Sequence, residues 1–520
     1  SSGDSKIMSR RNGGIIGPTN TPTGGIVTGL AGGVWRMNDV LTFVSNNQWP
    51  KVPESIDNSC IFNDNDSPNL SRTPSSASSR TTWTWSAWIK RSNITGGQMV
   101  LFGAKADSSN DTGIWFESDE TLKFFNNVGG TVKQIRTNAT FVDSSAWYHI
   151  VAVWDSTNST AGDRMRLYIN GVEVTSFGTD TNPGDGDEST VNSTVIHQIG
   201  RVDSTYHFDG YMAEVVFIDG QALDATSFGE FNTATGIWTP KKIGQFASAS
   251  QSVGNNSFYL NFKDSSNLGN DESGLSNDYA VSGIASTDQS TDTCVVNFAT
   301  WNGNVALNST MALADGNLEG LTGSNYASNA SNSFFSSLGM SAGKFYCEIK
   351  MTYASANQGE IVGVGYDLPK HQRGSSVNAY NLGYIAEGWS YLGAEGNIKN
   401  NNSTVLGSMP TWGTNDIVGI AIDVDNYKLY FSVNGTFINS GDPTSGSTGT
   451  GAVSLTTGKT YYFACSDASL SNTHKYQLNC GSPAFSISSG NSDANGFGNF
   501  EYSVPSGYYA LNTTNLNTYG

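Results

Sequence analysis

Charged side chains are scarce in this sequence, and basic ones most of all. Only 14% of the 520 residues are charged, with 27 lysines and arginines against 45 aspartates and glutamates, for a net charge of −18. Nucleic-acid surfaces need clustered positive charge, so this balance argues against a nucleic-acid partner. No run of about 18 apolar residues occurs, and we therefore expect no membrane insertion. Residues 1–18 also lack the apolar core of a secretory signal.

Cysteine is sparse as well. The five cysteines are scattered without the close spacing of a zinc site, and an odd number is untypical of a disulfide scaffold. Cys347 and Cys465 stand inside alternating apolar stretches that are typical of strands. We therefore expect buried free thiols, in a protein synthesised in a reducing cytoplasm.

Glycine and aromatic residues, in contrast, are abundant. The chain has 59 glycines, and 11% of its residues are aromatic, which is too many for a disordered chain. This composition is typical of an all-β protein with many turns. At this length, two β-sandwiches of roughly 200–250 residues each and an extra segment fit better than four small domains.

The stretch 147–174 has the pattern of a hairpin. Residues 147–154 carry apolar side chains on both faces, which indicates a strand covered on both sides. Residues 164–169 alternate and lead into Asn170-Gly171, a dipeptide that accepts positive φ at both centres of a tight turn. We predict that the two strands pair and that Trp154 and Leu167 are buried.

A second copy of this pattern occurs much later. Residues 417–422 and 427–433 read as two strands, and Asn434-Gly435 follows them. The repetition predicts an all-β fold of two antiparallel β-sandwiches in tandem.

The composition changes along the chain and suggests four segments. We predict an extended arm over 1–52, a sandwich over 53–245, a connector with one strand over 246–292, and a second sandwich over 293–520. Within the arm, residues 33–47 have helical spacing, and such a short helix must pack against something to be stable. Its apolar positions are predicted to anchor the protein in an assembly: Val34, Trp35, Met37, Leu41 and Val44.

Several motifs of the first sandwich occur in the order of a known family. They are Trp147-Tyr148-His149, the Asn170-Gly171 hairpin, Ile199-Gly200, and Phe208-Asp209-Gly210 followed by an alternating strand. This series resembles the laminin-G or concanavalin-A-like jelly-roll family. Residues 343–485 resemble the SPRY domain in the same way, through the strands that begin at Gly343 and the Asn434-Gly435 hairpin.

The amino-acid sequence resembles virion proteins of marine bacteriophages in three places: residues 62–92, residues 208–230, and the segment 33–50 ahead of them. That resemblance implies a viral structural protein at the virion surface, a tail or capsid appendage that attaches to a host-surface glycan or protein. Its partners would be other virion proteins, bound through the arm, and further copies of itself, for which a trimer suits a fibre. Two alternatives stay open: a capsid-decoration or tail-scaffold protein without a ligand, and a polysaccharide depolymerase.

Concanavalin-like folds include glycosidases, which use a pair of carboxylates for catalysis. The nearest acidic cluster is Glu117, Asp119 and Glu120, but Asp119 and Glu120 are adjacent in a predicted turn and should point apart. His149 fits a packing role in its strand better than a catalytic one. We therefore expect no enzyme activity.

Two kinds of binding site remain as candidates. Sugar rings pack on exposed aromatic rings, and Trp389, Tyr391 and Trp412 of the second sandwich could provide such a platform. No cofactor is required, but laminin-G-like domains often hold calcium with loop oxygens. The candidate calcium ligands are Asp64, Asp66, Asp185 and Asp187.

Overall fold

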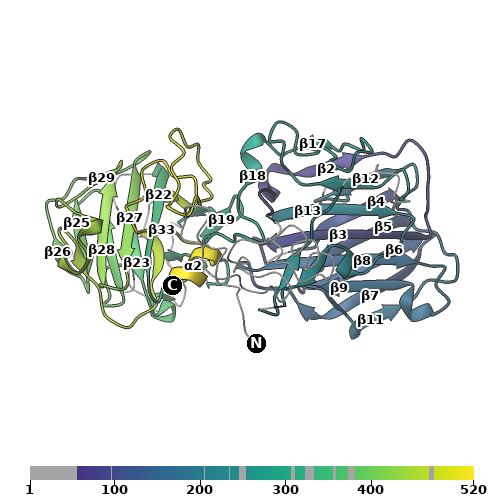
Figure 1. Cartoon of the computed structure of the whole chain (residues 1–520), viewed down its shortest axis with the longest axis horizontal. Coiled ribbons are helices and arrows are strands. Elements are labelled where there is room, and N and C mark those ends of the chain that lie inside the picture. The colour runs from purple at the N-terminus through teal and green to yellow at the C-terminus, as the bar shows by residue number, and fades with distance from the viewer. Residues whose placement is uncertain are drawn as a thin grey trace, which may run out of the picture.

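The computed structural model describes residues 55–94, 97–203, 205–233, 235–244, 253–305, 311–322, 333–354, 359–372, 381–467 and 473–520. Within these ranges the chain forms two β-sandwiches side by side along its long axis (Figure 1). The α-helix α2 (Thr513–Tyr519) is the one α-helix of the described residues, which confirms the all-β prediction. The predicted anchor residues Val34, Trp35, Met37, Leu41 and Val44 lie outside the described residues.

Two antiparallel sheets make up the first sandwich. The strands of one sheet are β1 (Ser59–Phe62), β3 (Thr82–Arg91), β8 (Trp147–Asp155), β9 (Met165–Ile169), β10 (Val172–Glu173), β13 (Gly210–Asp219), β16 (Phe258–Leu260) and β18 (Gln289–Ser290). They lie in the order β10-β9-β8-β3-β13-β1-β18, and β16 also pairs with β13. The strands of the other sheet are β2 (Asn69–Arg72), β4 (Met99–Asp107), β5 (Asn110–Phe116), β6 (Thr121–Val128), β7 (Thr131–Thr140), β11 (Phe177–Thr181), β12 (Ile196–Ile199) and β17 (Ala280–Ser282). Their order is β11-β7-β6-β5-β4-β12-β2-β17.

Strand β8 lies inside the first sheet and is covered on both faces. Its register with β9 places Ala152 opposite Leu167, as the predicted pairing requires. Ala152 and Trp154 face the core between the sheets, while Val151 and Val153 pack in a second cluster on the outer face. Trp154 and Leu167 are fully buried, so the predicted strand register is confirmed.

That outer cluster is completed by a small hairpin, β14 (Gly229–Phe231) and β15 (Trp238–Pro240). The segment predicted as a connector, 246–292, is not a separate linker. It contributes three strands rather than one, and each pairs with the first sandwich: β16 with β13, β17 with β2 and β18 with β1. Strands this short leave too little periodicity to be recognised in the sequence.

The second sandwich has a large and a small sheet. The large sheet contains β19 (Ala312–Ala314), β20 (Glu319–Leu321), β22 (Lys344–Ala354), β27 (Ile417–Asp423), β28 (Lys428–Val433), β29 (Thr436–Phe437), β30 (Val453–Ser454), β32 (His474–Asn479) and β33 (Tyr509–Ala510). The small sheet contains β21 (Ser333–Phe335), β23 (Glu360–Gly365), β24 (Gly388–Leu392), β25 (Asn397–Asn400), β26 (Ser403–Leu406) and β31 (Tyr462–Asp467). β22 and β27 lie near the centre of the large sheet, and only the pairing of β33 with β22 is parallel among the described strands.

Both predicted Asn-Gly turns are present. The φ angles are 48° and 80° at Asn170 and Gly171, and 48° and 80° at Asn434 and Gly435. All five cysteines are free, and four of them are buried, whereas Cys294 is partly exposed. Among the described residues, no helix has the length and apolar character needed to cross a membrane.

Candidate functional site

The three rings predicted as a sugar platform are buried in the second core. Trp389 and Trp412 are each 4% exposed, and Tyr391 is fully buried. Trp389 and Tyr391 belong to β24 and point to the same side of the strand, into the core, where Trp412 packs edge-on against Tyr391 at 6.0 Å. The prediction of Trp389 and Tyr391 as loop residues was wrong, because they belong to a strand whose aromatic face fills the sandwich. Trp412 does lie outside the strands, but its ring is buried in the same core. Buried rings cannot stack on a sugar.

The candidate calcium ligands lie in two separate places. Asp64 and Asp66 are the first and last residues of a short 3-10 helix. Asp185 and Asp187 lie in a surface turn where Asp187 accepts a hydrogen bond from the Gly184 amide at 2.6 Å. Calcium takes six to eight oxygens, many of them from carboxylates. In the described part of the chain, no three His, Cys, Asp or Glu side chains are close enough to hold a metal ion. These loops do not fit a preformed calcium site, and calcium binding stays a prediction.

The acidic turn of the first sandwich has a structural role. Asp119 forms an ion pair with Arg136, and Glu120 forms one with the buried Arg91 at 2.5 Å. The two carboxylates are thus held by different cations on different strands. Paired carboxylates of a glycosidase must face a common cleft, and these do not.

Ser86 and His149 are in contact, but the protonation of the ring excludes general-base catalysis. The Ser86 Oγ lies 2.9 Å from His149 Nε2, and Trp238 Nε1 donates to His149 Nδ1 at 3.0 Å. Because Nδ1 is an acceptor, the proton of the neutral ring is on Nε2, which therefore donates to Ser86 and cannot take its proton. Burial lowers the pKa of His149 to about 3 and keeps the ring neutral.

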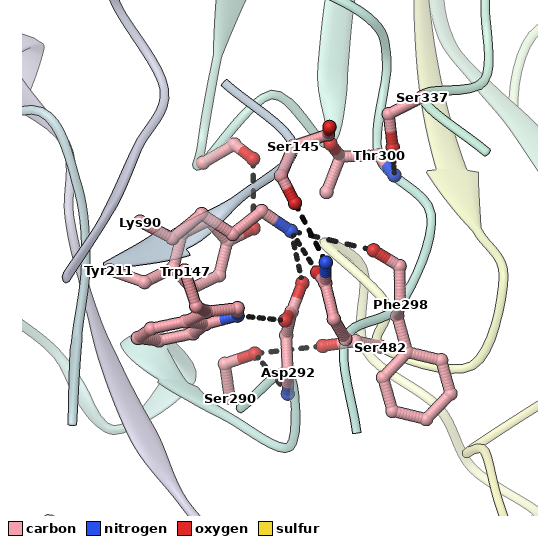
Figure 2. Close-up of polar contacts among 12 residues, drawn as sticks. Lys90, Ser145, Trp147, Tyr211, Ser290, Asp292, Phe298, Thr300, Ser337 and Ser482 are labelled. Atoms are coloured by element: carbon pink, nitrogen blue, oxygen red, sulfur yellow. Dashed lines mark hydrogen bonds and ion pairs between the residues drawn. The ribbon is translucent and has the colours of Figure 1, made fainter. Parts of the chain in front are cut away.

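The most developed polar cluster lies where the two sandwiches meet (Figure 2). Lys90, at the end of β3, is 1% exposed, and its ammonium lies 2.8 Å from Asp292 Oδ2. The same ammonium donates to Asn297 Oδ1 at 2.8 Å and to the Phe298 carbonyl at 3.4 Å, so all three donors are used. The Trp147 indole donates to Asp292 Oδ1 at 3.1 Å. We call this cluster the joint.

The charges of Lys90 and Asp292 are buried in the joint, so each depends on the other for compensation. Burial raises the pKa of Asp292, and Lys90 and the Trp147 hydrogen bond act in the opposite direction. Removing one partner of a buried ion pair typically costs about 3–5 kcal/mol, whereas replacing both by apolar residues is often neutral. The Lys90–Asp292 pair therefore contributes little net stability, while the same ammonium contacts Asn297 and Phe298 at the start of the second sandwich.

Further contacts cross the same boundary. The Tyr211 hydroxyl of β13 donates to the Gly316 carbonyl of the second sandwich at 2.8 Å, and the Tyr211 ring packs against Leu318. In the opposite direction, Asn317 Nδ2 donates to the Ser92 carbonyl at 2.9 Å. Hydrogen bonds to buried backbone groups fix relative position, because leaving any of them unmade is costly. Buried hydrogen bonds in both directions thus join the two sandwiches.

Lys90 and Asp292 were not among the residues predicted from the sequence. The available signal was a lysine and an arginine, Lys90 and Arg91, at the end of a strand that is otherwise rich in tryptophan. A charge in such a strand needs a buried partner. Nothing in the sequence identified that partner, which lies 202 positions away.

Comparisons with known proteins found one family model and several solved structures. Residues 64–227 match the family model described as the Concanavalin A-like lectin/glucanases superfamily. The SPRY domain of human HERC1 is 14% identical over 34% of this chain and 96% of its own, with a TM-score of 0.26. The PSpry domain of TRIM65 is 14% identical over 35% and 89%, with a TM-score of 0.26. A heptameric SAP-like pentraxin from Limulus polyphemus is 19% identical over 33% and 79%, with a TM-score of 0.25.

No curated protein matches the sequence. The family model covers most of the first sandwich and supports its interpretation as a lectin-like jelly roll. The solved structures, with TM-scores of 0.25 and 0.26, carry no argument.

Proposed function

We propose that this chain is a non-enzymatic structural protein of a bacteriophage virion, exposed on the tail or capsid, that attaches to a host-surface glycan or protein. The virion part of the proposal comes from the sequence resemblance of residues 33–92 and 208–230. It works as a homo-oligomer that contacts other virion proteins through residues 1–52. Laminin-G-like and SPRY-like domains are typically binding modules, which suits attachment.

The observation that carries the proposal is the joint. An appendage has to present its binding surfaces at a fixed distance and angle from the particle, and a flexible linker would not do this. Here the linking segment is part of the first sandwich, and Asp292 joins Lys90 to the start of the second. A rigid tandem of sandwiches, with loops at their ends, is suited to display.

A second candidate is a capsid-decoration or tail-scaffold protein without a ligand. The burial of Trp389, Tyr391 and Trp412 favours it, because the one platform proposed from the sequence is not at the surface. A jelly roll can serve as an inert spacer as well as a lectin.

Two experiments distinguish the attachment protein from the scaffold: antibody labelling of phage particles, and competition of the purified chain with phage adsorption to host cells. Antibodies raised against residues 55–520 should decorate intact particles of the encoding phage in electron micrographs. The purified chain, added in excess, should reduce adsorption of the phage to its host. Decoration without competition favours the scaffold, and absence of the chain from particles rejects the proposal. Release of reducing sugar from host capsule would instead support a depolymerase.

Deletion of residues 1–52 tests the assembly anchor. We expect the shortened chain to fold, to stay soluble and to be absent from particles. Its melting temperature, compared with that of the full chain, is the control for folding. If it is incorporated at normal copy number, the arm is not the anchor.

A further inference from the structure

At the joint, one lysine contacts a side-chain amide as well as a carboxylate. Lys90 Nζ lies 2.8 Å from Asp292 Oδ2 and donates to Asn297 Oδ1 at 2.8 Å. Figure 2 shows the Lys90 side chain reaching toward Asp292. Among the hydrogen bonds of the described residues, no other lysine contacts both kinds of group. A nucleophile, an electrophile and a proton acceptor therefore meet at Lys90 Nζ.

The Asn297 carboxamide is held in position for attack. Its Nδ2 donates to the Ser145 carbonyl at 2.7 Å, and the Asn297 backbone amide donates to Thr513 Oγ1 at 3.2 Å. Because Oδ1 is about 1.2 Å from the carbonyl carbon, Lys90 Nζ lies within roughly 4 Å of that carbon. Reacting atoms in a near-attack geometry are about 3–3.5 Å apart, so a small rotation of the carboxamide completes the approach.

The lysine and the aspartate are shielded from water. Lys90 is 1% exposed, Asp292 is fully buried, and the Lys90 ammonium lies 5.2 Å from the centre of the Tyr211 ring. Moving a proton from lysine to aspartate removes both charges, which burial favours relative to water. Burial raises the pKa of Asp292, while Lys90 and the Trp147 hydrogen bond act in the opposite direction. The site therefore promotes formation of the neutral, nucleophilic amine.

We propose that Lys90 and Asn297 form an intramolecular isopeptide bond, with Asp292 as the proton acceptor. Asp292 takes a proton from the Lys90 ammonium, and the neutral amine attacks Cγ of Asn297. The new C–N bond forms to Lys90 Nζ, the bond from Cγ to Nδ2 breaks, and proton transfer through Asp292 lets the nitrogen leave as ammonia. The products are an amide, ammonia and a protonated Asp292, so protons and charge balance without an oxidant or a cofactor. The inference does not depend on where the protein works.

Asn297, and not Asp292, is the electrophile. A carboxylate resists attack by an amine because its charge is spread over both oxygens, whereas a carboxamide is neutral. Lys90 has one ion-pair partner among the described residues, so Asp292 would have no second carboxylate to replace it as proton acceptor. The chemistry thus assigns one role to each of the three side chains.

The bond would join the two sandwiches covalently. Lys90 belongs to β3, which lies inside the first sheet between β8 and β13. Asn297 lies two positions before Ala299, which is part of the second core. A pulling force on the second sandwich would then reach an inner strand of the first. A cross-link between residues so far apart in the chain also restricts the unfolded state, which adds to stability.

Mass spectrometry of the full chain under denaturing conditions tests for the bond. We expect a mass below that of the sequence by one ammonia, and a branched tryptic peptide that contains both Lys90 and Asn297. A cyclic imide at an Asn-Gly site would lose the same mass, but its peptides are linear. Loss of one water would indicate a Lys90–Asp292 bond and overturn the assignment. Linear peptides for both residues, in folded chain stored for several days, overturn the proposal.

Variants identify the role of each side chain. Lys90→Arg keeps the charge and Asn297→Ala keeps the ion pair, but neither can form the bond, so each should have the mass of its sequence. Asp292→Asn removes the proton acceptor and should slow bond formation after a pulse of synthesis by roughly 10²–10⁴-fold. Asn304→Ala is the control, because Asn304 Oδ1 accepts from Ser144 Oγ at 3.1 Å and is not a partner of Lys90. Loss of ammonia should therefore persist in this control.

Melting temperatures show which of these variants fold. Asn297→Ala leaves Lys90 paired with Asp292, so it is the variant in which folding should be affected least. It also supplies the unreacted chain in which that ion pair can be studied by itself. A branched peptide in folded Asn297→Ala would reject Asn297 as the electrophile.

Cleavage of the chain between the two residues gives a readout that does not depend on mass. Gly129 and Gly130 form an exposed turn with nothing within 4 Å of either Cβ position, so a protease site inserted there should be tolerated. After cleavage, the two pieces should stay joined on a reducing, denaturing gel, because Lys90 is in one and Asn297 in the other. In the Asn297→Ala background they should separate. Separation in both backgrounds would show that the bond does not form.

Discussion

The two Asn-Gly hairpins, one in each sandwich, have the same local chemistry. The Asn170 side chain accepts a hydrogen bond from the His149 amide at 2.8 Å, and the Asn434 side chain accepts one from the Ile417 amide at 3.0 Å. The two amides lie near the start of β8 and β27, the strands that pair with β9 and β28, so each asparagine ties its turn to the neighbouring strand. The glycine that follows has a φ of 80° in both. Turn chemistry of this kind is local and recurs wherever the dipeptide does.

Each glycine is covered by an aromatic ring from a distant part of the chain. A Cβ on Gly171 would lie 2.2 Å from Trp238 Cε3, and a Cβ on Gly435 would lie 2.4 Å from Tyr502 Cδ1. Both rings come from segments that follow the hairpins in the chain. The glycine at each turn is thus needed for two reasons: its backbone has positive φ, and the ring approaches too closely for a Cβ.

The hairpins differ in what anchors the covering ring. Trp238 Nε1 donates to His149 Nδ1, a neutral imidazole, at 3.0 Å. The Tyr502 amide donates to Glu348 Oε1, a buried carboxylate, at 2.8 Å. The same turn is therefore held by a basic group in one sandwich and an acidic group in the other. Burial lowers the pKa of His149 and raises the pKa of Glu348. Acid should therefore change the stability of the two sandwiches in opposite directions.

Breaking the joint should cause the largest loss of stability, because it removes the buried contacts between the two sandwiches. Asp292→Asn leaves Lys90 charged and buried without its carboxylate, and we expect a loss of about 3–5 kcal/mol. Loss of coupling should also divide one unfolding transition into two, observable by scanning calorimetry. Lys90→Met with Asp292→Leu should restore most of the stability. Asp203→Asn, which breaks the partly exposed pair with Lys105, should cost at most about 1 kcal/mol.

Matched core truncations show whether each hairpin supports only its own sandwich. Leu167 and Phe431 stand at the same distance from their turns, and the carbonyl of each accepts the amide of the returning chain, from Val174 at 2.8 Å and Ile438 at 3.0 Å. Both side chains are buried, so Phe431→Ala should cost roughly 3–5 kcal/mol and Leu167→Ala roughly 2–5 kcal/mol. Urea unfolding measures both. If the joint couples the sandwiches, either variant lowers the same transition.

The hairpin strands were predictable because their evidence is local. Leu167 alternates with its neighbours, and Asn170-Gly171 needs only its own backbone angles, so a few residues are enough to read both. Trp389 shows the limit of this reading, because a tryptophan in a short strand has the same local pattern as one in a loop. Its burial is decided by the facing sheet. The partnership of Lys90 and Asp292 is likewise set by topology, which no local pattern contains.

Alanine at the turn glycines should have a smaller effect, of similar size in both sandwiches. Gly171→Ala and Gly435→Ala each add a methyl group that meets a ring, and overpacking of this kind costs about 1–3 kcal/mol. Trp238→Ala should make Gly171→Ala less costly, measured as a double-mutant cycle. Gly129→Ala is the control, because that glycine also has positive φ but nothing lies within 4 Å of its Cβ position. An equal loss at Gly129 would show that backbone strain, not the ring, sets the cost.

Acid should have the smallest effect, counted for each pH unit, on the free energy of unfolding. This effect should differ between the two sandwiches. Burial lowers the pKa of His149 to about 3, below the value of about 6.5 in an unfolded chain. Between these values the unfolded state binds a proton that the folded state does not, so stability falls as the pH falls from about 6.5. The slope for one such group is roughly 1.4 kcal/mol per pH unit. His197, with its pKa lowered to about 4, adds a similar slope in the same sandwich.

Glu348 should act in the opposite sense in the second sandwich. Burial raises the pKa of Glu348, so the folded state takes up its proton at a higher pH than the unfolded state does, and stability through this group is lost as the pH rises. Acidification from neutral pH should therefore weaken the first sandwich without weakening the second through its anchor. Hydrogen exchange, corrected for the intrinsic effect of pH, resolves the two sandwiches. His149→Asn keeps an acceptor for Trp238 but does not titrate, so it should reduce the slope of the first sandwich by roughly 1.4 kcal/mol per pH unit. An unchanged slope would mean that another group senses the acid, and the contrast between the two anchors would lose its basis.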